Sequence, residues 1–131
     1  MNFFNCLYDT FIYIEIGGTG GSAFRPMYAK FLEEASLIIN KPELNEIAEL
    51  FKKSGRLWSE IATAALPDSW PVLKRTRELT VEKNQIFEEN GLSGLEKMGK
   101  INVELDDLMK KAVIELQKID ATPLLENRKS L

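Results

Sequence analysis

The sequence contains no histidine and only one cysteine, Cys6. Without histidine, the chain cannot form a Cys-His or Ser-His-Asp catalytic arrangement or a histidine-based zinc site. A single thiol also excludes an internal disulfide and a multi-thiolate metal site, which is typical of a reducing compartment. We therefore expect no catalytic residue, metal or cofactor in this chain, and we expect Cys6 to be a buried small hydrophobe.

Long apolar runs and an excess of positive charge are also missing. No segment reaches the ~18 consecutive apolar residues of a membrane span. The 17 basic and 20 acidic residues give a net charge of -3, so the chain lacks the positive surplus that neutralises phosphates or anionic lipids. These features predict a cytoplasmic protein whose partners are neither nucleic acid nor membrane.

Apolar residues recur at helical spacing over most of the chain. Four helices are predicted, over about residues 25–40, 43–65, 71–90 and 93–119. Pro26 and Pro71 suit first helical positions, and Asn90-Gly91 suits a helix end. In the second of these helices, Ser54 and Gly55 are small enough to let another helix approach closely. In the first, we expect one buried apolar face, made of Met27, Tyr28, Phe31, Leu32, Ala35 and Ile38.

Residues 1–16 fit either a helix or, at Phe11 to Ile16, a strand, and we favour the helix. The run from Gly17 to Ser22 then interrupts regular structure, because its four glycines free the backbone. The sequence therefore predicts one all-α domain over residues 1–131, a bundle of about four to five helices with a glycine-rich loop before the second helix. Residues 120–131 read as a tail. A homodimer is expected because the long helices carry more apolar surface than one small bundle hides.

The glycine-rich loop is the one segment with a pattern known from ligand binding. Gly18 to Ala23 matches the G-x-G-x-x-G/A dinucleotide fingerprint, and Ile14 to Gly20 is similar to the first motif of S-adenosylmethionine-dependent methyltransferases. Both folds need parallel strands alternating with helices, whereas everything after Pro42 has helical period. Nucleotide or S-adenosylmethionine binding is therefore a lesser alternative.

The segment from Glu15 to Ala35, Glu-Ile-Gly-Gly-Thr-Gly-Gly-Ser-Ala-Phe-Arg-Pro-Met-Tyr-Ala-Lys-Phe-Leu-Glu-Glu-Ala, resembles the signature of a helical domain of unknown function. That domain occurs at the C-terminal side of proteins similar to butirosin biosynthesis protein H, and the likeness extends loosely to about Leu66. Those proteins carry an N-terminal domain that resembles a papain-like cysteine peptidase and that acts, in the type member, as an acyltransferase. The resemblance implies that this chain is the C-terminal domain or a fragment of a larger protein, or a free-standing relative.

The resemblance also implies a role for the glycine-rich loop. On this reading Gly17, Gly18, Thr19, Gly20, Gly21 and Arg25 shape a pocket or an interface beside the absent acyltransferase domain, present in cis or in trans. Glu15 is expected to orient Arg25 through a charge-assisted hydrogen bond. The leading hypothesis is therefore an accessory domain that helps to form the acyltransferase's substrate pocket. The alternative is a stand-alone helical oligomerisation or protein-interaction module.

Overall fold

The computed structural model describes residues 2–17 and 21–118, and every regular element in them is helical, as predicted. The elements in chain order are α1 (Phe3–Phe11), a π-helical turn (Ile12–Ile16), α2 (Gly21–Ile38), α3 (Glu43–Ala65), α4 (Pro71–Asn90), a 3-10 turn (Gly91–Gly94) and α5 (Leu95–Gln117). Gly18, Thr19, Gly20 and the predicted tail, residues 120–131, lie outside the described residues. The all-α fold class is confirmed.

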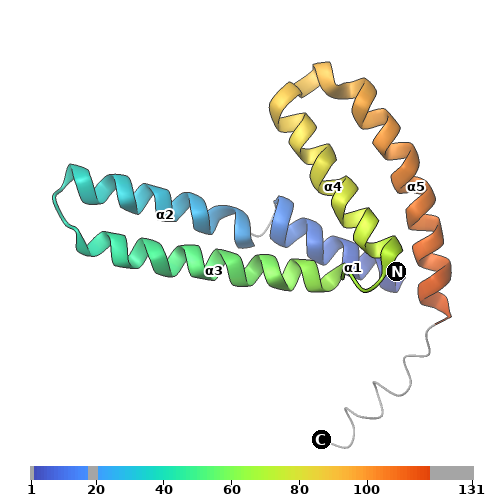
Figure 1. Cartoon of the computed structure of the whole chain (residues 1–131), viewed down its shortest axis with the longest axis horizontal. Helices are drawn as coiled ribbons and strands as arrows, with labels where there is room; N and C mark the ends of the chain where they lie inside the picture. Colours follow the sequence, from blue (N-terminus) through green and yellow to red (C-terminus); the bar gives the residue numbers. More distant parts are fainter. Residues whose placement is uncertain (1, 18–20, 119–131) are drawn as a thin grey trace, which may run out of the picture.

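The helices pair into two antiparallel hairpins, one made of α2 and α3 and the other of α4 and α5 (Figure 1). The two hairpins diverge from the region where α1 lies, and α1 packs on both α3 and α5. Along α3, the helix pairs with α2 from its N-terminal end as far as Trp58, and its C-terminal end packs with α1. This arrangement leaves most of the α2–α3 hairpin clear of the α4–α5 hairpin.

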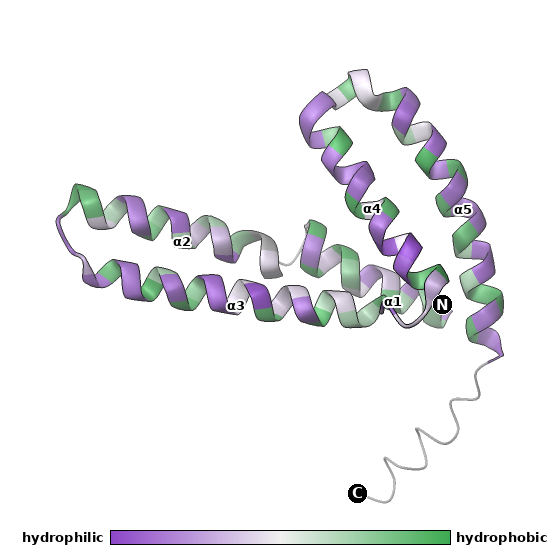
Figure 2. Cartoon of the chain, viewed as in Figure 1, coloured by the Kyte–Doolittle hydropathy of each residue, from purple (hydrophilic) through white to green (hydrophobic). Residues whose placement is uncertain are grey.

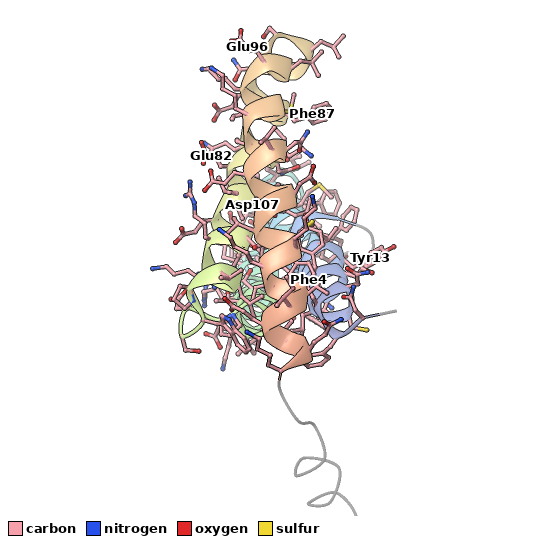
Figure 3. The ribbon with its side chains drawn as sticks, turned by 90° about the vertical axis from the view of Figure 1, so that its right-hand side faces the viewer. Phe4, Tyr13, Glu82, Phe87, Glu96 and Asp107 are labelled. Atoms are coloured by element: carbon pink, nitrogen blue, oxygen red, sulfur yellow. The ribbon has the colours of Figure 1, made fainter. Side chains whose placement is uncertain are left out.

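Two phenylalanines of α1 anchor the main core. Phe4 and Phe11 are each only 1% exposed, and burial of a side chain this large contributes roughly 2–3 kcal/mol. They pack in one cluster with residues from α3, α4 and α5 and with the residue that follows α3, namely Ala62, Leu73, Ala112, Leu116 and Leu66. Figure 3 shows Phe4 against α5, whereas Tyr13 projects away from the body of the molecule. The short first helix thus holds the two hairpins together.

The segment that fitted both a helix and a strand is helical. Phe11 ends α1, and the chain continues into the π-helical turn, where the Gly17 N–H donates to the Ile12 carbonyl oxygen at 3.0 Å. This five-residue spacing is wider than the four-residue spacing of an α-helix. The turn brings Glu15 to the side of α2 and α3.

The start of α2 differs from the prediction. We expected a loop through Ser22 and Pro26 at the first helical position, but α2 begins at Gly21 and Pro26 is its sixth residue. The first four N–H groups of a helix have no intrahelical partner, so Pro26 removes only the second hydrogen bond of α2. Gly21, predicted to lie in the loop, is thus the first residue of the helix.

Proline and glycine residues mark the bounds of α4, as the sequence predicted. Pro71 is the first residue of α4, and Gly91, with φ of 54°, follows its last residue. In Figure 2 polar and apolar residues alternate along each helix, as expected for helices with distinct faces. α5 ends at Gln117, slightly before the predicted Ile119.

Candidate functional site

The described candidate residues gather where the π-helical turn, α2 and α3 meet. Glu15 lies in the turn, Gly17 follows it, and Gly21 and Arg25 belong to the first two turns of α2. Gly18, Thr19 and Gly20 were predicted with them and lie outside the described residues. The described part of the predicted site is therefore one connected region rather than scattered positions.

Glu15 is held in this region by two serine side chains. Its Oε2 atom accepts a hydrogen bond from Ser59 Oγ of α3 at 2.9 Å and lies 3.0 Å from Ser22 Oγ of α2. Ser22 Oγ is equally close to the Ile14 carbonyl oxygen, at 3.0 Å, and Ser22 is buried. The Glu15 carboxylate therefore joins three elements. Sequence reasoning missed Ser22 and Ser59 as its partners.

Arg25 lies on the other side of the same helix start. Its guanidinium carbon is 5.0 Å from the centroid of the Trp58 ring, a cation–π contact between α2 and α3. The hydrogen bond we expected between Glu15 and Arg25 stays a prediction.

A polar cavity of about 660 Å³ opens beside Glu15. Its lining is Glu15, Ser22, Pro26, Lys52, Gly55, Arg56, Ser59 and Glu60. Lys52 is tied to Glu33 and to Glu49 by ion pairs, and the hydrogen bonds to these carboxylates, Glu33 first, raise its pKa above the ordinary value. Both charge signs line the cavity, which suits a polar ligand or a polar segment of a partner.

Gly55 of α3 and Pro26 of α2 both line the polar cavity and lie against each other. Gly55 is buried there, and a Cβ atom on it would lie 3.2 Å from Cδ of Pro26. The expectation that a small residue at this position lets another helix approach is thereby confirmed. Ser59 is one turn further along α3, so the small residue and the serine share the side that faces α2.

An aromatic groove of about 830 Å³ lies on the α2–α3 hairpin as well. It is lined by Phe24, Arg25, Met27, Tyr28, Phe31 and Phe51. The rings of Tyr28 and Phe51 meet edge to face, with centroids 4.7 Å apart, across the two helices. Met27, Tyr28 and Phe31 are exposed, so our expectation that they form the buried face of this helix is wrong.

The buried residues of α2 are smaller than predicted. They include Ala29 and Ser36, together with Leu32, and Ala29 packs against Ala48 of α3. Because α2 is apolar on more than one face, its pattern did not decide which face points inward. The contact between the two small residues Ala29 and Ala48 determines which face of α2 points toward α3.

Cys6 and the acidic side chains are further chemistry-bearing groups in the part of the chain that the structure describes. Cys6 is exposed on α1 rather than buried as we expected, because Phe4 and Phe11 take the inward positions of that short helix. In residues 2–17 and 21–118, no group of three or more acidic or cysteine side chains is placed to hold a metal ion. Among the described helices, none combines the length and apolarity needed to cross a membrane.

Comparison with protein families identifies the chain. A family model described as a domain of unknown function, DUF4872, matches residues 4–88. The chain belongs to the DUF4872 family. No curated protein and no solved structure matches it. The matched region of this DUF4872 domain covers α1, the π-helical turn, α2, α3 and most of α4, so both the polar cavity and the aromatic groove lie inside it.

The dinucleotide fingerprint has an unusual context in this DUF4872 domain. In the dinucleotide-binding fold the glycines follow a strand, whereas Ile12–Ile16 here form a π-helical turn. The glycine pattern therefore lacks the preceding strand on which its phosphate-binding geometry depends.

Proposed function

We propose that this chain is a non-catalytic accessory domain that packs against a papain-like acyltransferase domain, in cis or in trans, and helps to form its substrate pocket. The observation that carries the proposal is the polar cavity beside Glu15. It is open and built from three elements, and it carries both carboxylates and cations. It lies next to the segment whose sequence resembles the domain found beside such acyltransferases.

The composition of the chain supports a binding role over a catalytic one. General-base catalysis at neutral pH most often uses histidine, and the chain has none. Glu15 is engaged by Ser22 and Ser59, which fixes its carboxylate in one orientation. A fixed carboxylate is suited to accept hydrogen bonds from a polar substrate, such as an amine or a hydroxyl group.

Arg56 offers the sharpest test of this role. It lines the polar cavity and is exposed, so its substitution should leave the fold intact. We would combine the chain with a papain-like acyltransferase domain encoded in the same or a neighbouring reading frame and measure acyl transfer. Arg56→Gln and Glu15→Gln should each raise KM for the substrate about ten-fold or more, the effect of losing a hydrogen bond to a charged group.

Lys53→Gln is the matched control. Lys53 belongs to the same helix as Arg56 and is exposed, but it does not line the cavity. Its replacement by glutamine removes one positive charge, as Arg56→Gln does. With the Lys53→Gln chain, the KM for the substrate should stay within about two-fold of the KM measured with the unsubstituted chain, because an exposed charge contributes little. Equal effects of Arg56→Gln and Lys53→Gln, or no effect of the chain on the transferase, would reject the proposal.

The second candidate function is a stand-alone helical oligomerisation or protein-interaction module. The aromatic groove favours it, because contiguous exposed apolar surface on a small protein marks an interaction site. If the chain does not change acyl transfer but still associates stably, this reading replaces the first.

Nucleotide or S-adenosylmethionine binding through the glycine-rich loop is the third candidate. A thermal-shift series with each ligand tests it directly. A ligand present at a hundred times its dissociation constant stabilises the folded state by about 2.7 kcal/mol. No shift with nucleotides, S-adenosylmethionine or coenzyme A would remove this candidate.

A further inference from the structure

The interior of the α2–α3 hairpin is built from small residues. Ala29 and Ser36 of α2 and Ala48 and Gly55 of α3 are all buried. Ala29 and Ala48 are fully buried, at 0% exposure. Leu32 is buried beside them, with Leu44 and Phe51 packed against the same cluster. The two helices are therefore close together at the small residues, and most of their large apolar side chains lie elsewhere.

Those large side chains instead follow a second stripe on each helix. On α2 the stripe is Phe24, Tyr28, Phe31, Ala35 and Ile38, and on α3 it is Ile47, Leu50, Ser54, Leu57 and Ile61. The spacings alternate between three and four residues, which is the a and d pattern of helices that pack by knobs into holes. We call these ten residues the hairpin face.

Both stripes lie on the same side of the hairpin. At 3.6 residues per turn, each stripe is rotated in the same sense, by roughly a third of a turn, from the residues buried between the helices. In an antiparallel pair, equal rotations turn both stripes toward one side. The edge-to-face contact of Tyr28 with Phe51 joins the helices on that side, whereas the Glu33–Lys52 ion pair lies on the opposite one.

We propose that a second copy of this chain packs on the hairpin face, so that two α2–α3 hairpins form an antiparallel four-helix bundle. The eight large apolar residues of the face are 42 to 83% exposed, which amounts to roughly 800 Å² of surface per copy. A stable protein–protein interface buries about 800 Å² on each partner. The surface available on one copy thus matches what a two-fold dimer requires.

The pattern of the face also favours a copy of itself over an unrelated partner. A two-fold axis parallel to the hairpin places α2 of each copy beside α3 of the other, antiparallel and in register. Within the hairpin, Tyr28 lies level with Phe51 and Pro26 with Gly55. In the dimer Phe24 would therefore lie nearest Leu57 of the second copy and the small Ala35 nearest its larger Ile47. Large against small is how helical layers interlock.

The experiment is light scattering with size-exclusion chromatography on the full chain and two variants, each at about 50 μM, above the micromolar Kd of weak interfaces of this size. The full chain should have twice its monomer mass of 14.9 kDa. Leu50→Glu, on the hairpin face and 66% exposed, should have the monomer mass, because the dimer would bury its charge. Circular dichroism should show unchanged helix content.

Leu37→Glu is the matched control. Leu37 is 83% exposed on α2, on the side away from the hairpin face, so this variant should remain a dimer. A monomeric full chain would overturn the proposal, and if that monomer binds a papain-like domain through Leu50, the face belongs to that partner. A dimer that survives Leu50→Glu, or one that Leu37→Glu also dissociates, would place the interface elsewhere and overturn the proposal equally.

Discussion

Gly55 is the residue at which a single methyl group reports on the packing of the α2–α3 hairpin. A Cβ atom there would lie 3.2 Å from Cδ and 3.3 Å from Cγ of Pro26, and 3.5 Å from Cβ of Arg25. The ring of Pro26 cannot rotate away, because it is closed on the backbone of α2. An added side chain must therefore shift one helix relative to the other.

Gly99 in α5 provides the reference for the size of this effect. It is exposed and helical, and a Cβ atom on it would meet nothing within 4 Å. Gly99→Ala should therefore gain the full helix-propensity difference, about 0.8–1 kcal/mol. At Gly55 the tight contact offsets that gain, so Gly55→Ala should be at least about 1 kcal/mol less stable than Gly99→Ala.

Leucine at the two positions enlarges the difference. Gly55→Leu should be about 2–3 kcal/mol less stable than Gly99→Leu, because overpacking a close helix pair costs 1–3 kcal/mol while the propensity gain is shared. Urea unfolding followed by circular dichroism measures the free energies, at one fixed protein concentration because association would shift them. Equal free energies for the Gly55 and Gly99 variants would refute the close approach of α2 and α3 at Pro26.

Three further predictions concern the connections between helices. Arg77 donates to the Leu66 carbonyl oxygen at 2.5 Å and pairs with Asp68, so Arg77→Met should lower the free energy of unfolding by about 1–2 kcal/mol in urea titrations. The hydrogen bond from Arg77 holds the pKa of Asp68 below its ordinary value. The stabilisation is therefore complete above about pH 4 and is lost as the pH falls through the lowered pKa. Asp68→Asn should lower Tm at pH 7, and its difference from the unsubstituted chain should shrink as the pH is lowered below about 4. Gly94→Ala should also lower Tm, because its Cβ atom would lie 2.6 Å from Cγ2 of Ile86.

The helix bounds that the sequence predicted well are those marked by residues with a restricted backbone. Pro71 begins α4 and Gly91 follows its end, as expected, because proline lacks the N–H group that a helix interior needs and glycine accepts positive φ. At Gly21 the same reasoning was wrong. A glycine in the first helical turn loses no hydrogen bond, so the composition of the loop did not reveal where α2 begins.

The sequence predicted only those residues of the candidate site that lie close together along the chain. The segment from Glu15 to Arg25 carries its own signal in the glycines and the charged ends. Ser59, which holds the Glu15 carboxylate, is 44 residues away in the sequence, and no local pattern connects the two. The signal that existed was the small residue Gly55 on the inner stripe of α3, one helical turn before Ser59.

The two proposed surfaces lie on opposite sides of one hairpin. Arg56 and Lys52 line the polar cavity on the side of the Glu33–Lys52 ion pair, whereas Leu50 belongs to the hairpin face. A dimer formed through the hairpin face would thus leave two polar cavities open, one on each outer side. We therefore expect the polar cavity to work in the monomeric Leu50→Glu variant as well. Adding Arg56→Gln to Leu50→Glu should then raise the KM for acyl transfer about as much as Arg56→Gln does alone. A KM that Arg56→Gln leaves unchanged in the Leu50→Glu variant would mean that the cavity needs the second copy, and that dimerisation and pocket formation are one function.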